Sequence, residues 1–244
     1  MDAALLSLLD WYAEMGVDVP KVSAAKPVRR PLQKKQIAPA TSAPVPETVK
    51  RASIDLSKVK TLADLRAAIN GFDAGVLSDG ARQAVFSRGN PEADLMVIGE
   101  APGREEDIQG KPFVGPAGQL LDRMLAAIAL GEDDFYVTNV INWRDPKNRN
   151  PSPADIDTCR PFLEKHISLA KPKILLLVGG LSMSTLTGVT GIMKNHGQWH
   201  DVTIAGQTYP TFSLYHPAFL LRRPELKKDA WRDLLVLRER LLSL

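Results

Sequence analysis

The sequence predicts an α/β fold in which a parallel sheet of four strands carries helices on both faces. Four short segments are rich in apolar residues, as strands buried on both faces of a sheet are. Segments with helical periodicity lie between them. The chain has 244 residues, 44% of them hydrophobic, which is enough for one sizeable core with appendages.

The elements follow in alternating order from a folded body that begins near residue 54. Helices are expected at 61–70 ("TLADLRAAIN"), 117–129, 153–169 and 224–242, with a further short helix after residue 179. Strands are expected at 94–99 ("DLMVIG"), 135–141 ("FYVTNVI"), 173–179 ("KILLLVG") and 208–216 ("TYPTFSLYH"). We find no internal repeat.

Two segments precede the body. Apolar residues recur at helical spacing over residues 2–15, which predicts a short amphipathic helix within 1–16 that docks on the body or on a partner. Residues 17–53 are rich in Pro, Ala and Lys and predict a flexible linker.

The linker concentrates positive charge. Residues 21–51 hold eight Lys or Arg and one acid, a local charge of +7 in a chain whose net charge is +3. Either the segment attracts a polyanion such as DNA, or it is a solvated spacer.

Cysteine content and the N-terminus indicate the compartment. The one cysteine, Cys159, excludes an intrachain disulfide framework and fits a reducing compartment. The first residues carry acids where a signal peptide needs basic residues, and no apolar run reaches the roughly 20 residues of a membrane span. We expect a cytoplasmic protein that does not bind membranes.

Polar residues follow each predicted strand, where parallel α/β sheets bind their ligands. "GEAPG" follows the first strand, Asn142 to Arg144 follow the second with Asn139 near its end, Gly179 follows the third, and His216 ends the fourth. We expect these groups to converge at one edge of the sheet.

The stretch "GEAPGREEDIQGKPFVGPAGQLLDRML" at 99–125 carries the densest signal. Its glycines allow close approach of backbone to a ligand, although Gly and Pro are also routine in turns. Glu100 is placed to orient a water or to face a developing cation. The acids at 105–107 suit a solvated run or part of a helix start. Phe113, in an irregular segment, is either part of the core or a stacking platform for a flat ligand.

Three other positions are candidates. Asn139 offers an amide that suits the edge of a nucleobase, although such residues are usually structural. Of the four histidines, His216 is placed to act and His166 is expected to be structural. "PAFLLRRP" at 217–224 sets leucines beside arginines, as a protein that inserts a side chain into DNA requires, or else it is an ordinary helix-capping segment.

Together these stretches resemble the uracil-DNA glycosylase superfamily, closest to its family 4. The similarity is carried by "GNPEADLMVIGE", the stretch at 99–125, "TNVINWRDPKNRNP", "CRPFLEKHI" and "YHPAFLLRRP", in the family's order, over residues 72–242. It implies a three-layer α/β/α sandwich around the central parallel sheet, and a catalytic domain over 54–244.

The resemblance also implies roles. Glu100 and His216 would be catalytic. Glu100 would position or activate the hydrolytic water, and His216 would stabilise the charge on uracil O2. The base would be held by Ala101, Glu106, Phe113 and Asn139. Leu220 to Arg222 would form the loop that enters the DNA helix where the base leaves. We expect either Leu220 or Leu221 to fill the gap, and Arg149 and Arg222 to bind phosphates.

One departure from family 4 is large. Its members hold an iron–sulfur cluster with four cysteines, and the matching positions here are Phe72, Gly75, Trp143 and Cys159. One thiolate cannot hold such a cluster. We therefore expect no iron–sulfur cluster, with Phe72 and Trp143 filling its place by apolar packing. No Cys/His spacing indicates a zinc site, and we expect no metal.

The implied activity is excision of uracil from DNA by a monomer that leaves abasic DNA and free uracil. A protein that binds uracil or abasic DNA without catalysis is the alternative from a different class. An unrelated nucleotide-binding enzyme is disfavoured because no phosphate-loop lysine follows the glycines.

Overall fold

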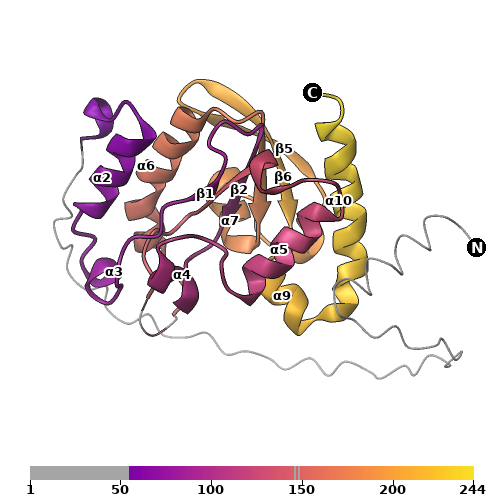
Figure 1. The fold of residues 1–244 in the computed structure, drawn as a ribbon, viewed down its shortest axis with the longest axis horizontal. Coiled ribbons are helices and arrows are strands. Elements are labelled where there is room, and N and C mark those ends of the chain that lie inside the picture. Colours follow the sequence, from indigo (N-terminus) through magenta and orange to yellow (C-terminus); the bar gives the residue numbers. More distant parts are fainter. Residues whose placement is uncertain (1–54, 146, 148) are drawn as a thin grey trace, which may run out of the picture.

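The fold is a six-stranded sheet between two layers of helices (Figure 1). The computed structural model describes residues 55–145, 147 and 149–244. The expected N-terminal helix and the basic linker lie outside these described residues. Within the described part, no helix combines the length and the apolar character needed to cross a membrane.

The strand order is β1-β3-β2-β4-β6-β5. The four inner strands run parallel, as predicted, and the edge strands β1 and β5 are antiparallel to their neighbours. The strands are β1 (Arg88–Gly89), β2 (Leu95–Gly99), β3 (Phe135–Asn139), β4 (Ile174–Val178), β5 (Trp199–Ile204) and β6 (Gln207–Leu214).

The helices connect and cover these strands. They are α2 (Leu62–Asn70), α3 (Val76–Asp79), α4 (Arg104–Gln109), α5 (Pro116–Ala126), α6 (Pro153–Ala170), α7 (Gly180–Thr187), α8 (Ile192–Asn195), α9 (Pro217–Arg222) and α10 (Lys227–Leu241). Single 3₁₀ turns lie at Leu56–Lys58, Glu132–Asp134 and Pro224–Leu226.

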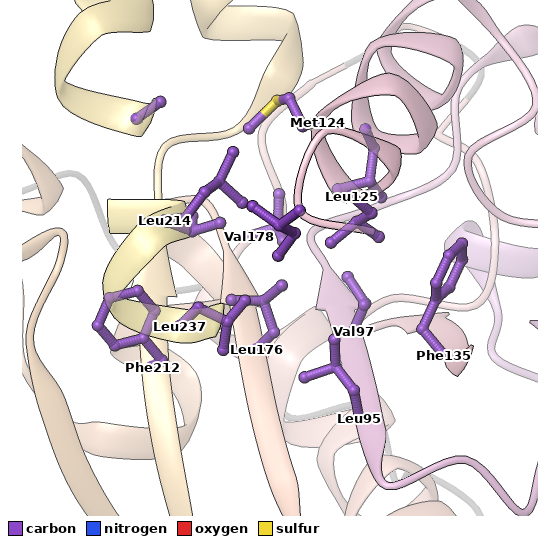
Figure 2. Packing of buried hydrophobic residues seen from close by; sticks show 14 of the residues in the cluster. Leu95, Val97, Met124, Leu125, Phe135, Leu176, Val178, Phe212, Leu214 and Leu237 are labelled. Atoms are coloured by element: carbon purple, nitrogen blue, oxygen red, sulfur yellow. The ribbon is translucent and has the colours of Figure 1, made fainter. Parts of the chain in front are cut away.

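Alternate residues of the inner strands build two separate cores, one on each face of the sheet. Val97 and Leu176 pack with residues of α5, α9 and α10 on one face. Figure 2 shows these two side chains together with Leu125 of α5 and Leu237 of α10. Their neighbours Met96 and Leu175 pack with α2 and α6 on the other. Two buried faces explain why β2 and β4 read as continuous apolar runs, and they confirm the three-layer α/β/α sandwich.

The two edge strands were not predicted. β5 and β6 form a hairpin whose turn residues, Ala205 and Gly206, have φ of 50° and 84°. Two-residue hairpin turns of this kind favour Asn-Gly or Asp-Gly, so Ala-Gly is a weak signal in the sequence. β5 alternates exposed and buried residues over part of its length. β1 is only two residues long, too short for any periodic signal.

Candidate active site at the carboxyl edge of the sheet

The segments that follow the parallel strands converge on one cavity of about 510 Å³. It is bounded by residues from the ends of β2, β3, β4 and β6 and from helices α8 and α9. Of the predicted site residues, Glu100, Ala101, Arg149, His216 and Arg222 line it. The strand-end reasoning therefore locates the cavity correctly.

The Glu100 carboxylate is fixed at the N-terminus of α7. Its Oε1 atom accepts a hydrogen bond of 2.9 Å from the backbone N–H of Leu181. Gly179 makes this approach possible, because a β-carbon there would lie 2.3 Å from Oε1. The positive end of a helix favours a negative charge. Oε2 makes no hydrogen bond with other described residues, so it can accept one from a water or face a cation.

His216 lies in the same cavity as a neutral imidazole. Its Nδ1 accepts a 3.1 Å hydrogen bond from the N–H of Ala218 in the first turn of α9, so the ring proton of the neutral form is on Nε2. Burial lowers the pKa of His216, the charge of Arg222 acts in the same direction, and Glu100 and Glu106 oppose the effect. The result is a neutral donor facing a site that also holds a carboxylate.

Phe113 and Asn139 meet above Gly99. A β-carbon at Gly99 would lie 2.4 Å from both Oδ1 of Asn139 and Cε2 of Phe113, so only glycine permits this contact. Phe113, held at φ 54°, stacks on the His216 ring with centroids 5.6 Å apart and planes at 28°. Both side chains are buried and neither lines the cavity wall. The structure thus brings Phe113 against His216, with Asn139 next to Phe113, beside the cavity.

Glu106 organises the segment that carries Phe113. Its Oε1 accepts hydrogen bonds of 3.0 and 2.9 Å from the N–H groups of Val114 and Gly115. Its carboxylate is buried in the first turn of α4. The acids at 105–107 are therefore a helix start rather than a wholly solvated run. A contact between Glu106 and uracil remains a prediction.

The leucines of α9 have different environments. Leu220 is 0% exposed and belongs to the core beneath the helix, so of the two leucines that the sequence left as alternatives it is not the one at the surface. Leu221 is 42% exposed and therefore available. Arg222, next in the chain, lines the cavity and forms no ion pair with any described residue.

Arg149 also lines the cavity, but two carboxylates hold its guanidinium. Nε lies 2.6 Å from Asp145 and Nη1 lies 2.5 Å from Asp155. Asp155 in turn accepts hydrogen bonds from Ser152 at the start of α6. These contacts give Arg149 a structural role in the loop before α6. Arg222 is better placed to bind a phosphate, because its charge is not paired with a carboxylate of the described residues.

The four positions that the resemblance aligns with cluster ligands hold two aromatic side chains, a glycine and one thiol. The rings of Phe72 and Trp143 lie 6.3 Å apart, and both rings contact Phe162. Cys159 is fully buried in the same core. Among the residues the structure describes, no three His, Cys, Asp or Glu side chains are grouped as a metal site. A cluster that needs four thiolates does not fit this donor set.

The sequence did not indicate every residue of the site. Ile192 and Met193 of α8 line the cavity although nothing in their local pattern marks them. Tyr215 also lines it, and a tyrosine at the end of a buried strand reads simply as core. These residues reach the cavity through the path of the loops, which periodicity does not encode.

Comparison with known proteins identifies related sequences. The family model described as "Uracil DNA glycosylase superfamily" matches residues 86–235. The chain is 38% identical over 168 residues to the type-4 uracil-DNA glycosylase of Saccharolobus solfataricus, covering 66% of this chain and 78% of that protein.

Two further relatives bear the same name. The chain is 36% identical over 150 residues to the protein from Archaeoglobus fulgidus, covering 59% of this chain and 75% of the relative. It is 34% identical over 186 residues to the protein from Pyrobaculum aerophilum, covering 74% and 92%. With a family match that spans more than half of its length, the chain belongs to the uracil-DNA glycosylase superfamily.

Proposed function

We propose that this protein removes uracil from DNA by hydrolysing the N-glycosidic bond, leaving an abasic site. The observation that carries the proposal is the pairing of Glu100, pinned at the start of α7, with a neutral His216 in one cavity. The names of the relatives support the same reaction.

The reaction separates charge, and the site matches that separation. As the bond from C1′ to N1 breaks, its electron pair leaves with uracil and the sugar becomes cationic. The carboxylate of Glu100 stabilises the sugar and orients the attacking water through Oε2. Nε2–H of His216 donates to uracil O2, where negative charge develops. Water adds its oxygen to C1′, and its proton ends on the released uracil.

A neutral histidine suits this task for a physical reason. A protonated imidazole would form an ion pair with Glu100 and weaken the charge that the carboxylate offers to the sugar. The lowered pKa of His216 keeps the ring neutral near pH 7. Its hydrogen bond from Ala218 fixes the ring so that Nε2 is the donor.

Phe113 and Asn139 hold the base in this proposal. The side-chain amide of Asn139 makes no hydrogen bond with other described residues, so it can both donate to and accept from the uracil edge. Phe113 stacks on the ring of the base, and Ala101 contributes backbone contacts on the cavity wall. Glu106 fixes the segment that presents Phe113.

The base must leave the duplex before it reaches this site. Unstacking and unpairing cost a few kcal/mol, least at a mismatch. Leu221 fills the gap in the stack and Arg222 binds a flanking phosphate. We further propose that the protein acts as a monomer without a metal or an iron–sulfur cluster, because no step above needs one.

Single-turnover excision tests the assignment. Glu100→Gln removes the charge at constant shape, and His216→Ala removes the donor. Each variant should slow excision by on the order of 10²-fold or more. Ser184→Ala, which changes a side chain of α7 that bonds only within its helix, should excise at the wild-type rate. Wild-type rates from both site variants would rule out the assignment.

A further inference from the structure

Helix α8 presents an exposed apolar side chain at the cavity, Met193, whereas the exposed Leu221 of α9 lies outside the cavity lining. Met193 is 51% exposed, more than Leu221 on α9, and both helices contribute to the cavity wall. Single exposed hydrophobic residues are common on protein surfaces. Met193 differs from these because it lines the one cavity that holds Glu100 and His216.

The charge next to Met193 repeats the pattern of α9. Lys194 follows Met193 and is exposed, as Arg222 follows Leu221. Lys194 has no ion-pair partner in the described part of the chain. Each helix therefore places an apolar side chain beside an unpaired cation, a combination suited to base steps and phosphates of DNA.

The turn that carries Met193 is held firmly by its neighbours. The Asn195 amide donates to the carbonyls of Thr190 and Gly191 at 2.9 and 3.0 Å. His196 is joined to Asp233 of α10 through Nδ1 and Oδ2 at 2.6 Å. These bonds fix both ends of a four-residue helix.

Packing fixes α8 from below. Ile192 packs against the core, and the ring of His196 stacks on Tyr215 with centroids 4.2 Å apart. A rigid support lowers the entropy lost when an exposed side chain binds. Met193 can therefore contact a partner with a small loss of conformational entropy.

We propose that Met193 is a second DNA-contacting residue, which packs against the duplex next to the extruded nucleotide and works with Leu221. The inference rests on the proposed uracil excision. A methionine is unbranched and polarizable, so it can follow base steps of different sequence. Met193 should raise the excision rate on double-stranded DNA only, since a single strand has no base-paired stack from which the nucleotide must be extruded.

The test compares Met193→Ala with wild type on one oligonucleotide, presented single-stranded, paired as U·A and paired as U·G. Met193→Ala should slow single-turnover excision from the U·A duplex about tenfold, and less from U·G, whose base is easier to extrude. The single-stranded rate should stay within about twofold of wild type. Met193→Leu, which keeps an apolar side chain, should restore most of the duplex rate.

Val236→Ala serves as the matched control, because Val236 is also exposed but lies on α10 and does not line the cavity. Its rates should equal those of wild type. Equal rates of Met193→Ala and wild type on the duplex, or equal losses on duplex and single strand, would overturn the role of Met193. Absence of excision by wild type on every substrate would instead overturn the proposed function.

Discussion

Replacing Gly179 with alanine should displace the Glu100 carboxylate without removing any functional atom. The new β-carbon would lie 2.3 Å from Oε1, whereas a carbon and an oxygen in contact stay about 3.3 Å apart. The carboxylate must therefore move by about 1 Å, and a displacement of that size can cost about 10²-fold in rate. The φ of 110° at this position adds backbone strain for any side chain.

Single-turnover excision and thermal unfolding would be measured together for Gly179→Ala and for Gly188→Ala at the other end of α7. Gly188 also has a positive φ, 72°, but a β-carbon there meets nothing within 4 Å. We expect Gly188→Ala to lose stability and keep its rate. A folded Gly179→Ala protein that excises uracil at close to the wild-type rate would refute the role given to Glu100 geometry.

Three further predictions follow from individual side chains. Burial lowers the pKa of His166 to about 3, so the unfolded chain binds a proton that the folded chain does not, and stability should fall as pH drops from 6.5 toward 3. Urea titrations at a series of pH values should show that the free energy of unfolding of wild type falls about 1.4 kcal/mol more per pH unit than that of His166→Phe. Parallel plots of unfolding free energy against pH for the two proteins would contradict this prediction. Leu221→Ala should slow excision from duplex DNA and leave the free energy of unfolding within about 0.5 kcal/mol of wild type. Leu220→Ala should lower the free energy of unfolding by about 2–5 kcal/mol. The opposite pattern would reverse the assignments of the two leucines. Arg222→Gln should reduce the slope of log K for DNA binding against log salt concentration by about one, and Arg149→Gln should reduce it by less. Fluorescence anisotropy across a salt series measures this slope. Equal reductions for the two variants would restore the phosphate role of Arg149.

The sequence allowed the location of the cavity to be predicted, because the residues after parallel strands meet at one edge of the sheet. That rule correctly placed Glu100 and His216 on one cavity. It could not separate Leu220 from Leu221, since adjacent residues of a short helix point in different directions and only the packed structure shows which one enters the core.

The partners of charged side chains could not be predicted from the sequence either. Arg149 was expected to meet phosphate, yet Asp145 and Asp155 bind it, and Asp155 is brought there by the start of α6. Glu106 was assigned to the base by resemblance, while its hydrogen bonds go to the backbone of the Phe113 segment. Such pairings depend on loop paths, which leave no periodic signal.

The most direct test of the account incubates the purified full-length protein, in EDTA, with end-labelled DNA that carries one uracil. Alkali then breaks any abasic site, and a gel sizes the product. The account predicts a cut at the uracil, produced without any metal. An uncut strand, with a retarded complex in a parallel binding assay, would contradict it and leave a protein that recognises uracil without excising it.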